Sequence, residues 1–313
     1  MAEYQQPAGS ARVEFGLAVI DKPAGITSNA ALSRVRRISR NKRAGHTGTL
    51  DPFATGVLVV AVGRATRLFP LLHAENKRYS AILRLGASTD TADLTGEVVA
   101  LAPVPDFSAN DLVAVSKAMR GPQLQIPPAY SAKKVAGVPS HVLARQGRAV
   151  ELGAVEIEVF SLALARTDDI GSDCIAIDVE CSRGTYVRTL AEEVAHRLGT
   201  LGHLIALRRT LSDGFGIEAA VALDDFSPAS FLPLEVVLQG FDIAFITEAV
   251  LGRARHGHEI PQEDLLGGPV QGDRPVAVFL ASAASAGLGA TNLIGIYRVG
   301  PSGRLVAEML FVA

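Results

Sequence analysis

The chain has 313 residues, is 48% hydrophobic and 20% charged, and carries a formal net charge of −2. This length accommodates one large domain and a small one, and the charge content is that of an ordinary soluble protein. No apolar run approaches the roughly 18 residues of a membrane span, and no basic segment precedes an apolar one as in a signal peptide, so we expect no membrane association.

A short strand over 17–20 leads through a Pro- and Gly-containing turn into a predicted helix over 29–39, capped by Thr27 or Ser28. One side of this helix is apolar and the other is basic. The apolar side consists of Ala31, Leu32, Val35 and Ile38, and the basic side consists of Arg34, Arg36, Arg37 and Arg40. Lys42 and Arg43 extend the basic run toward the next loop.

Positive charge is concentrated in this part of the chain. Residues 12–78 contain twelve Lys or Arg and four Asp or Glu, a balance of +8, and the remainder contains eighteen and twenty-eight, a balance of −10. A basic segment in an acidic protein favours a surface that meets phosphates. A solvated helix face explains the charge count equally well.

The segment 45–58 holds one acid, Asp51, on a glycine-rich loop with a proline directly after it. Six apolar residues over 57–62 then predict a buried strand. A lone carboxylate on a tight loop braced by a core strand is typical of a catalytic site. An ordinary Asp-Pro turn is the alternative.

Tyr79 begins a predicted strand over 79–85 and directly follows Lys77 and Arg78. An aromatic side chain among cations can stack on a nucleobase. A core tyrosine at a strand edge is the alternative interpretation.

Cys174 and Cys181 are the only cysteines and end a segment in which apolar and polar residues alternate. This pattern predicts a strand, on which residues seven apart lie on opposite faces. The two thiols therefore cannot bridge each other. So few cysteines favour a reducing, cytoplasmic setting.

A helix is predicted to begin near Thr185 and to end at Gly199. Its apolar face consists of Leu190, Ala191, Val194 and Leu198. Arg188 lies in the first turn, where a cation opposes the helix dipole, so an anionic partner is expected. Asp51 is the candidate partner, and a surface salt bridge is the alternative.

Strands outnumber helices, which favours an α+β fold: a mixed, mainly antiparallel sheet with helical insertions and a small β-rich C-terminal domain. The predicted domains are residues 1–240 and 241–313. The other predicted elements are a helix over 108–119, strands over 155–165, 174–181 and 203–210, a helix and linker over 224–238, a helix over 247–256, and strands over 276–280 and 293–312 around a loop at 281–290.

Signatures of several cofactors are missing from the sequence. Gly45 and Gly48 are not followed by the Gly-Lys-Ser/Thr of a phosphate loop, and no Gly-x-Gly-x-x-Gly opens a helix. The seven histidines have no cysteine at metal-binding spacing, so we expect no metal site.

Six segments, in order, resemble the motifs of the TruB family of tRNA pseudouridine synthases, and together they span most of residues 17–210. They are Asp-Lys-Pro-Ala-Gly-Ile-Thr-Ser at 21–28, Gly-His-Thr-Gly-Thr-Leu-Asp-Pro-Phe-Ala-Thr-Gly-Val-Leu at 45–58, Lys-Arg-Tyr at 77–79, Pro-Pro-Ala-Tyr-Ser-Ala at 127–132, Cys-Ser-Arg-Gly-Thr-Tyr-Val-Arg-Thr at 181–189 and Leu-Arg-Arg at 207–209. The C-terminal module resembles a PUA-type RNA-binding domain.

The resemblance implies isomerisation of uridine 55 in the T loop of tRNA to pseudouridine, without metal or organic cofactor. It implies that Asp51 is the nucleophile, attacking the uracil ring or C1′ of the ribose. Tyr79 would stack on the flipped-out uracil, and Arg188 would orient Asp51. The resemblance further implies that His46 fills the space left by the base, and that Lys22, Tyr186 and Leu207 line the pocket.

Phosphate contacts are predicted from charge alone, for Arg36, Arg37, Arg40, Lys42, Arg43 and Lys133. Two positions depart from the family pattern: Arg183 stands where lysine is common, and Ser140-His141 stands where an aromatic is frequent. Guide-RNA-dependent relatives carry extra segments such as lysine-rich tails, and none is seen in this sequence. We therefore expect a stand-alone monomer that binds the tRNA T arm without an obligate protein partner. An RNA-binding or RNA-folding module with incidental catalysis is the rival hypothesis.

Overall fold

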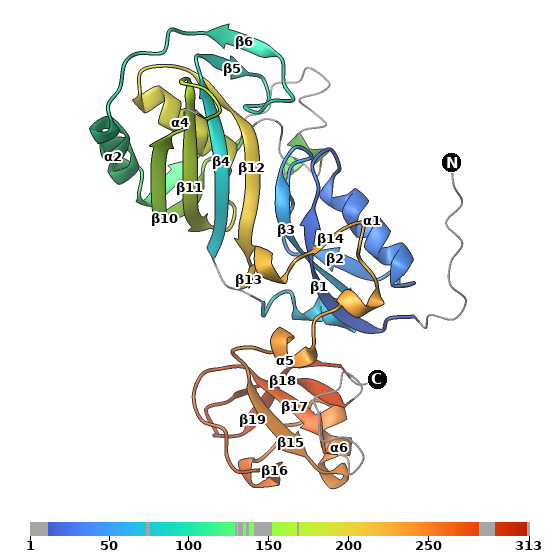
Figure 1. The fold of residues 1–313 in the computed structure, drawn as a ribbon. Helices are drawn as coiled ribbons and strands as arrows, with labels where there is room; N and C mark the ends of the chain where they lie inside the picture. Colours follow the sequence, from blue (N-terminus) through green and yellow to red (C-terminus); the bar gives the residue numbers. More distant parts are fainter. Residues whose placement is uncertain are drawn as a thin grey trace, which may run out of the picture.

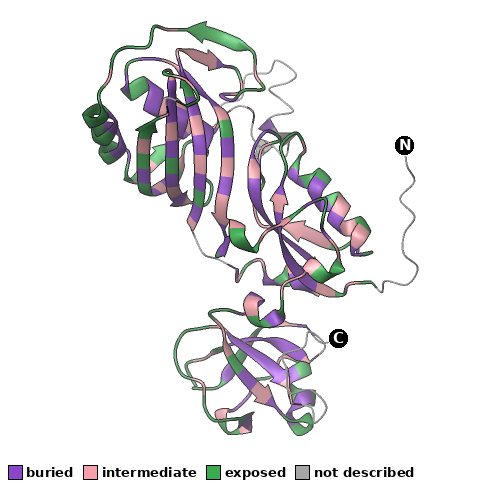
Figure 2. Cartoon of the chain, in the orientation of Figure 1, coloured by how far each residue is buried: buried purple, intermediate pink, exposed green. Residues whose placement is uncertain are grey.

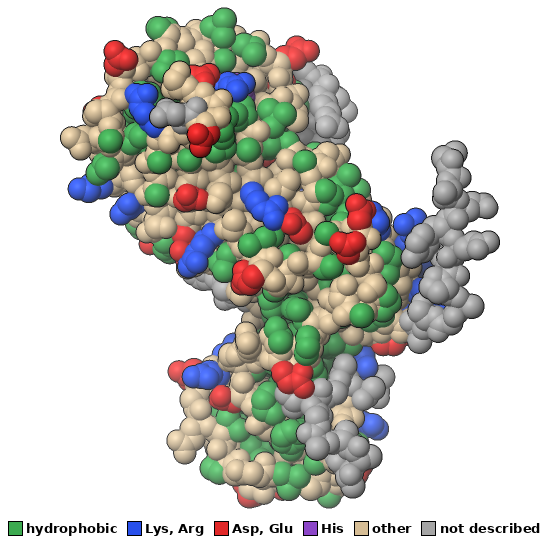
Figure 3. Space-filling view, viewed as in Figure 1, with side chains coloured by type: hydrophobic (Ala, Val, Ile, Leu, Met, Phe, Trp, Pro, Cys, Tyr) green, Lys and Arg blue, Asp and Glu red, His purple; other side chains and the backbone are tan. Residues whose placement is uncertain are grey.

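A computed structural model of the chain describes residues 12–72, 76–128, 130, 134–135, 138–140, 152–167, 169–281 and 292–311. Two sheets follow one another along the chain, a large one and a small C-terminal one, joined by a narrower waist (Figures 1 and 3). The predicted α+β class is confirmed. None of the helices in the described part of the chain is long and apolar enough to cross a membrane.

The large sheet has ten strands, and most neighbours are antiparallel. Its main path runs β14-β1-β3-β12-β4-β11-β10-β7, with β2 paired to β3 and β13 paired to β12. The strands are β1 (Phe15–Lys22), β2 (Ala44–His46), β3 (Thr55–Gly63), β4 (Asn76–Leu85), β7 (Gly121–Gln125), β10 (Val155–Arg166), β11 (Cys174–Ser182), β12 (Gly202–Ser212), β13 (Phe215–Gly216) and β14 (Val221–Ala222).

The two halves of this sheet meet where β3 touches β12. The contact is parallel and only two residues long, pairing Thr55 with Arg208 and Gly56 with Arg209. Gly56 has φ +99°, and a Cβ there would lie 2.2 Å from the carbonyl oxygen of Arg209. Only glycine permits both this conformation and this approach. The junction lies directly after the Asp51 loop, which is thereby placed at the centre of the sheet.

In the described part of the chain, the helices α1, α2 and α4 pack against the large sheet (Figure 1). The helix α1 (Ser28–Ile38) is capped by the Thr27 hydroxyl and buries its predicted apolar side against β1 and β3, where strand residues are buried almost throughout (Figure 2). The helix α2 (Ala109–Ala118) packs on β10, and α4 (Val187–Arg197) packs on β12. A capping box between Ser108 and Asp111 begins α2, as the sequence predicts.

Two small two-stranded ribbons are separate from the large sheet among the described residues. One pairs β5 (Ala87–Thr89) with β6 (Val98–Leu101), and all four residues of β6 are exposed. The other pairs β8 (Lys134–Val135) with β9 (Val138–Pro139). The chain between β5 and β6 folds back so that Asp93 forms an isolated bridge with Leu204 of β12. This bridge brings a polar loop into the middle of the large sheet.

The C-terminal sheet has the order β16-β15-β17-β18-β19. Its elements are β15 (Asp242–Ile246), α6 (Glu248–Arg255), β16 (Leu265–Leu266), β17 (Val276–Leu280), β18 (Leu293–Val299) and β19 (Leu305–Leu310). One face, with α6, forms a core of its own. The other face shares an apolar cluster with β1 and β3 of the large sheet. Apart from residue 281, the loop predicted at 281–290 lies outside the described residues.

The segment 224–238 is less helical than predicted. It holds only a 3-10 turn (Pro228–Ser230) and the four-residue helix α5 (Leu234–Val237). Pro228 and Pro233 explain the difference, because proline is tolerated at a helix start but not within one. Further 3-10 turns occupy Arg64–Leu68, Ile217–Ala219 and Gln262–Asp264. Cys174 and Cys181 are both buried and free, which confirms that they do not bridge each other.

Candidate active site

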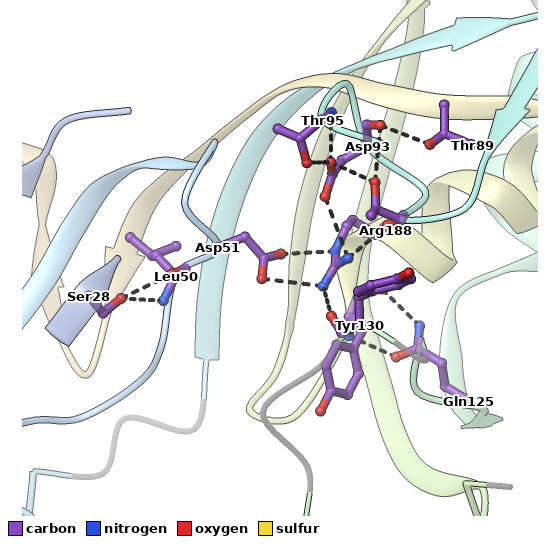
Figure 4. Close-up of polar contacts among 11 residues, drawn as sticks. Ser28, Leu50, Asp51, Thr89, Asp93, Thr95, Gln125, Tyr130 and Arg188 are labelled. Atoms are coloured by element: carbon purple, nitrogen blue, oxygen red, sulfur yellow. Dashed lines mark hydrogen bonds and ion pairs between the residues drawn. The ribbon is translucent and has the colours of Figure 1, made fainter. Parts of the chain in front are cut away.

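Asp51 lies on the loop between β2 and β3, and a buried hydroxyl on α1 fixes that loop (Figure 4). Ser28 Oγ accepts a hydrogen bond from the Leu50 amide at 2.8 Å and donates one to the Leu50 carbonyl at 3.0 Å. A turn then closes as the Ala54 amide donates to the Asp51 carbonyl at 3.1 Å. The Asp51 side chain is 33% exposed, so one carboxylate on a rigid backbone faces open space.

Arg188, in the first turn of α4, holds this carboxylate from the side. Its Nε lies 2.9 Å from Asp51 Oδ2, and its Nη2 donates to Asp51 Oδ1 at 3.3 Å. The remaining guanidinium hydrogens are also used, since Nη1 donates to the Thr91 carbonyl and Nη2 to the Tyr130 carbonyl. The arginine is 4% exposed and cannot swing away without breaking these bonds. The predicted Asp51–Arg188 ion pair is confirmed.

A second carboxylate, Asp93, shares the same arginine and was missed by the sequence analysis. Its Oδ2 lies 3.5 Å from Arg188 Nη1, and its side chain is 5% exposed. Its Oδ1 accepts from the Thr91 hydroxyl and from the amide and hydroxyl of Thr95 (Figure 4). The only signal in the sequence is an acid in a polar loop, and 95 residues separate it from Arg188.

The charge state of Asp51 is set by opposing effects. Burial raises its pKa from the ordinary aspartate value, Arg188 opposes that rise, and the neighbouring charge of Asp93 adds to it. One guanidinium therefore neutralises a partly desolvated carboxylate whose environment disfavours ionisation.

Asp51 and Arg188 line a cavity of about 610 Å³, within the size range of small-molecule sites. The lining residues are Thr47, Gly48, Thr49, Leu50, Asp51, Lys77, Tyr79, Arg183, Gly184, Thr185, Tyr186, Val187, Arg188 and Leu207. Gln125 fixes the backbone of Tyr186, accepting from its amide at 2.7 Å and donating to its carbonyl at 3.1 Å. Tyr186 and Leu207 thus lie where the sequence analysis expected them.

Tyr79 forms part of the cavity wall and lies four residues into β4, since that strand begins at Asn76 rather than at Tyr79. It pairs with Val179 on one side and Arg209 on the other. The residue is 8% exposed, and burial raises the pKa of its hydroxyl. The ring is therefore a neutral, rigid surface beside the carboxylate.

Lys22 and His46 are not among the cavity-lining residues. Lys22 is fully buried, and its Nζ donates to the carbonyls of Pro23, Ile26 and Pro52, which ties the turn after β1 to the Asp51 loop. Burial lowers the pKa of Lys22 to about 8. The expectation that Lys22 lines the pocket is therefore wrong, because its ammonium is consumed by three backbone carbonyls.

His46 lies on β2, half-buried, next to the loop. Burial lowers its pKa, and the charges of Arg209, Lys77 and Arg36 lower it further. A cationic environment of this kind keeps the imidazole neutral near pH 7.

The residues proposed for phosphate contacts fall into two groups. Arg37, Arg40, Lys42 and Arg43 are exposed, and Arg36 is half-buried. Arg36 donates to the Ala44 carbonyl, and Arg43 donates to the Thr66 hydroxyl. Lys133 lies outside the described residues.

Residues 36–187 match the model of the TruB family pseudouridylate synthase N-terminal domain. A protein named tRNA pseudouridine synthase B from Mycobacterium tuberculosis is 43% identical over 251 residues, which is 79% of this chain and 84% of that protein. Its namesake from Mycobacteroides abscessus is 38% identical over 86% of this chain and 93% of that protein. The chain belongs to the TruB family.

Solved structures agree with this family assignment at the level of the fold. An H/ACA RNP bound to a substrate RNA containing 2′-deoxyuridine contains a chain that is similar with a TM-score of 0.65 and 20% identity. The match covers 96% of this chain and 86% of that one. A chain of the archaeal box H/ACA sRNP Nop10-Cbf5 complex matches with a TM-score of 0.63 and 21% identity, over 96% of this TruB-family chain and 87% of that one.

Proposed function

We propose that this chain isomerises uridine 55 in the T loop of tRNA to pseudouridine, with Asp51 as the nucleophile. The observation that carries the proposal is the Asp51–Arg188 pair, held at 2.9 Å in the wall of a cavity that also holds Tyr79. The names of the bacterial relatives supply the substrate, tRNA, and the product.

The reaction breaks the N1–C1′ bond and forms a C5–C1′ bond, while C5 loses a proton and N1 gains one. Asp51 attacks either the uracil ring or C1′ of the ribose and is released at the end. Atoms balance without an oxidant, a reductant or water, so the chemistry requires no cofactor. Arg188 orients the carboxylate through two parallel contacts, a geometry that only arginine provides.

Substrate recognition requires that the uridine leave its stack. Extrusion costs a few kcal/mol, and stacking on an aromatic ring returns about 1–3 kcal/mol. We propose that Tyr79 supplies the stacking ring and that His46 fills the space in the RNA that the flipped-out base leaves. Tyr186 and Leu207 complete the pocket for the base.

Outside the pocket, we assign phosphate contacts to the exposed side chains of Arg37, Arg40, Lys42 and Arg43. We further propose that residues 1–240 form the catalytic domain and residues 241–313 a PUA-like RNA-binding domain. The protein then acts on the T arm as a cytoplasmic monomer without an obligate protein partner.

The test is incubation of the purified chain with an unmodified T-arm hairpin, followed by mass spectrometric detection of pseudouridine after cyanoethylation. Product at the position equivalent to 55, and at no other uridine, supports the proposal. Tight binding without product favours the rival hypothesis of an RNA-binding or RNA-folding module. The rival hypothesis does not explain why a negatively charged carboxylate lies in a cavity that faces RNA, because binding alone does not require one.

A further inference from the structure

Lys77 is a buried lysine that the chemistry at Asp51 does not use. The residue is 9% exposed and lines the cavity, and its ammonium takes part in no ion pair or hydrogen bond found among the described residues. An ammonium without a partner is expensive to bury, so such a group at a cavity wall indicates an anionic ligand.

Arg209 stands behind Lys77 and is fully buried. Its Nε donates to the Val57 carbonyl at 2.7 Å and its Nη2 donates to the Gly48 carbonyl at 3.0 Å. Its buried Nη1 has no hydrogen-bond partner among the described residues. The guanidinium therefore ties the Asp51 loop to β3 and leaves uncompensated positive charge next to the cavity.

Gly48 keeps open the space in which these cations meet. A Cβ at this position would lie 2.5 Å from Lys77 Nζ and 3.4 Å from Arg209 Nη1. A methyl group there would displace the ammonium, so the glycine preserves the position of the Lys77 charge.

The surrounding groups leave this corner positive. Asp213 is the acid whose negative charge interacts with the Lys77 ammonium. Its carboxylate already accepts hydrogen bonds from the hydroxyls of Thr47 and Ser212. Arg183, an exposed cation, lines the same cavity and adds to the positive charge. Three cations thus face one carboxylate that is engaged elsewhere.

We propose that Lys77, backed by Arg209 and flanked by Arg183, binds a backbone phosphate adjacent to the nucleotide that enters the cavity. Lys77 and Tyr79 lie two residues apart on β4 and so point to the same face, roughly 7 Å apart. That separation is comparable to the span from base to phosphate within one nucleotide. A base stacked on Tyr79 therefore places its own phosphate, 5′ or 3′, near Lys77. This inference rests on the proposed RNA substrate.

The test combines Lys77→Met with T-arm hairpins that carry a neutral methylphosphonate on the 5′ or the 3′ side of the target uridine. Loss of a charged hydrogen bond predicts that the variant lowers kcat/KM by about 10- to 100-fold. One of the two methylphosphonates should lower wild-type kcat/KM similarly, and combining it with Lys77→Met should cause no further loss. The proposal would be overturned if neither methylphosphonate lowered the wild-type kcat/KM. It would also be overturned if, at both positions, the loss from the methylphosphonate multiplied the loss from Lys77→Met.

Lys117→Met is the matched control, because Lys117 is exposed on α2 and its replacement removes the same charge. It should leave kcat/KM unchanged within about twofold, as surface changes usually do. Lys77→Met should keep the thermal midpoint of the wild type, since it removes an unpaired buried charge. A lowered midpoint together with unchanged RNA affinity would show a merely structural lysine and refute the phosphate contact.

Measuring RNA affinity at several salt concentrations distinguishes failure of this inference from failure of the proposed function. Removing one lysine–phosphate ion pair should reduce the slope of log affinity against log salt concentration by about 0.7–0.9. Lys77→Met should show that decrease with the unmodified hairpin even if the wild type forms no pseudouridine. An unchanged slope refutes the subsite, whatever the outcome of the activity assay.

Discussion

At the residue scale, the site depends on one arginine that serves two carboxylates. Arg188 contacts Asp51 at 2.9 Å and Asp93 at 3.5 Å, and both the arginine and Asp93 are almost fully buried. Hydrogen bonds from Thr91 and Thr95 hold the Asp93 carboxylate in place. Asp93 thus helps to hold the Arg188 guanidinium in place, and Arg188 in turn holds the Asp51 carboxylate.

Asp51→Asn should abolish turnover and leave RNA binding largely intact, because the amide has the same shape but cannot act as the nucleophile. We expect kcat to fall by about 10³-fold or more. Release of tritium from a hairpin labelled at uridine C5 measures turnover, and fluorescence anisotropy measures binding. A rate near that of the wild type would exclude Asp51 as the nucleophile.

Arg188→Met should shift the acidic limb of the kcat/KM profile to higher pH. Burial and Asp93 both raise the pKa of Asp51, and Arg188 opposes them, so its removal raises that pKa further. The proposed mechanism requires the ionised Asp51 carboxylate, so activity should then appear only at a higher pH. We also expect kcat at the plateau to fall by about 10²-fold or more, because the carboxylate is no longer oriented.

Arg188→Lys is the matched variant for this prediction, because it keeps the charge without the planar fork. It should shift the acidic limb less than Arg188→Met does while still lowering the plateau. An acidic limb at the same pH in all three proteins would contradict the assigned electrostatics.

At the scale of elements, the short junction between β3 and β12 sets the position of the Asp51 loop. The loop enters β3 at Gly56, and Arg209 of β12 bonds both to that loop and to β3. A shift of one strand against the other would therefore move Asp51 relative to Tyr79 on β4.

Gly56→Ala should lower the free energy of unfolding by about 3 kcal/mol or more, because the Cβ meets backbone and the φ of +99° is strained for alanine. Gly252→Ala is the control, since that helical glycine has nothing within 4 Å of its Cβ position. The control should raise stability by about 0.5–1 kcal/mol. Chemical denaturation of the three proteins distinguishes these outcomes, and equal stabilities would contradict the tight junction.

At the scale of the whole molecule, the C-terminal sheet is attached to the large sheet through shared apolar packing. Phe279 and Phe311 belong to the same buried cluster as Leu17 and Val59. Arg64 also donates to the carbonyl of Phe311 at 2.6 Å. Shared apolar packing and hydrogen bonds from arginine side chains to backbone carbonyls therefore join the two sheets.

Removal of residues 241–313 should therefore destabilise the large sheet in addition to weakening RNA binding. The truncation exposes the apolar side chains of β1 and β3 that face this cluster. We expect a lower thermal midpoint and a higher tendency to aggregate than in the full chain. A truncated protein as soluble and as stable as the full chain would contradict the shared core.

Local patterns in the sequence predicted much of this architecture, because they report on single elements. Helical periodicity placed the buried side of α1 and the first-turn position of Arg188. The cost of a cation at a helix start then predicted its pairing with Asp51, which the structure confirms. The glycine-rich loop and the apolar run after it correctly placed Asp51 before a core strand.

Tertiary structure alone decided how the site is completed. Asp93 reaches Arg188 because its loop bridges to β12, and Lys77 meets Arg209 because β4 lies between β11 and β12. Lys22 is withdrawn from the cavity because three carbonyls surround its ammonium. Pairing between segments far apart in the chain sets the contacts of Asp93 and Lys77, and periodicity within one strand carries no information about its neighbours.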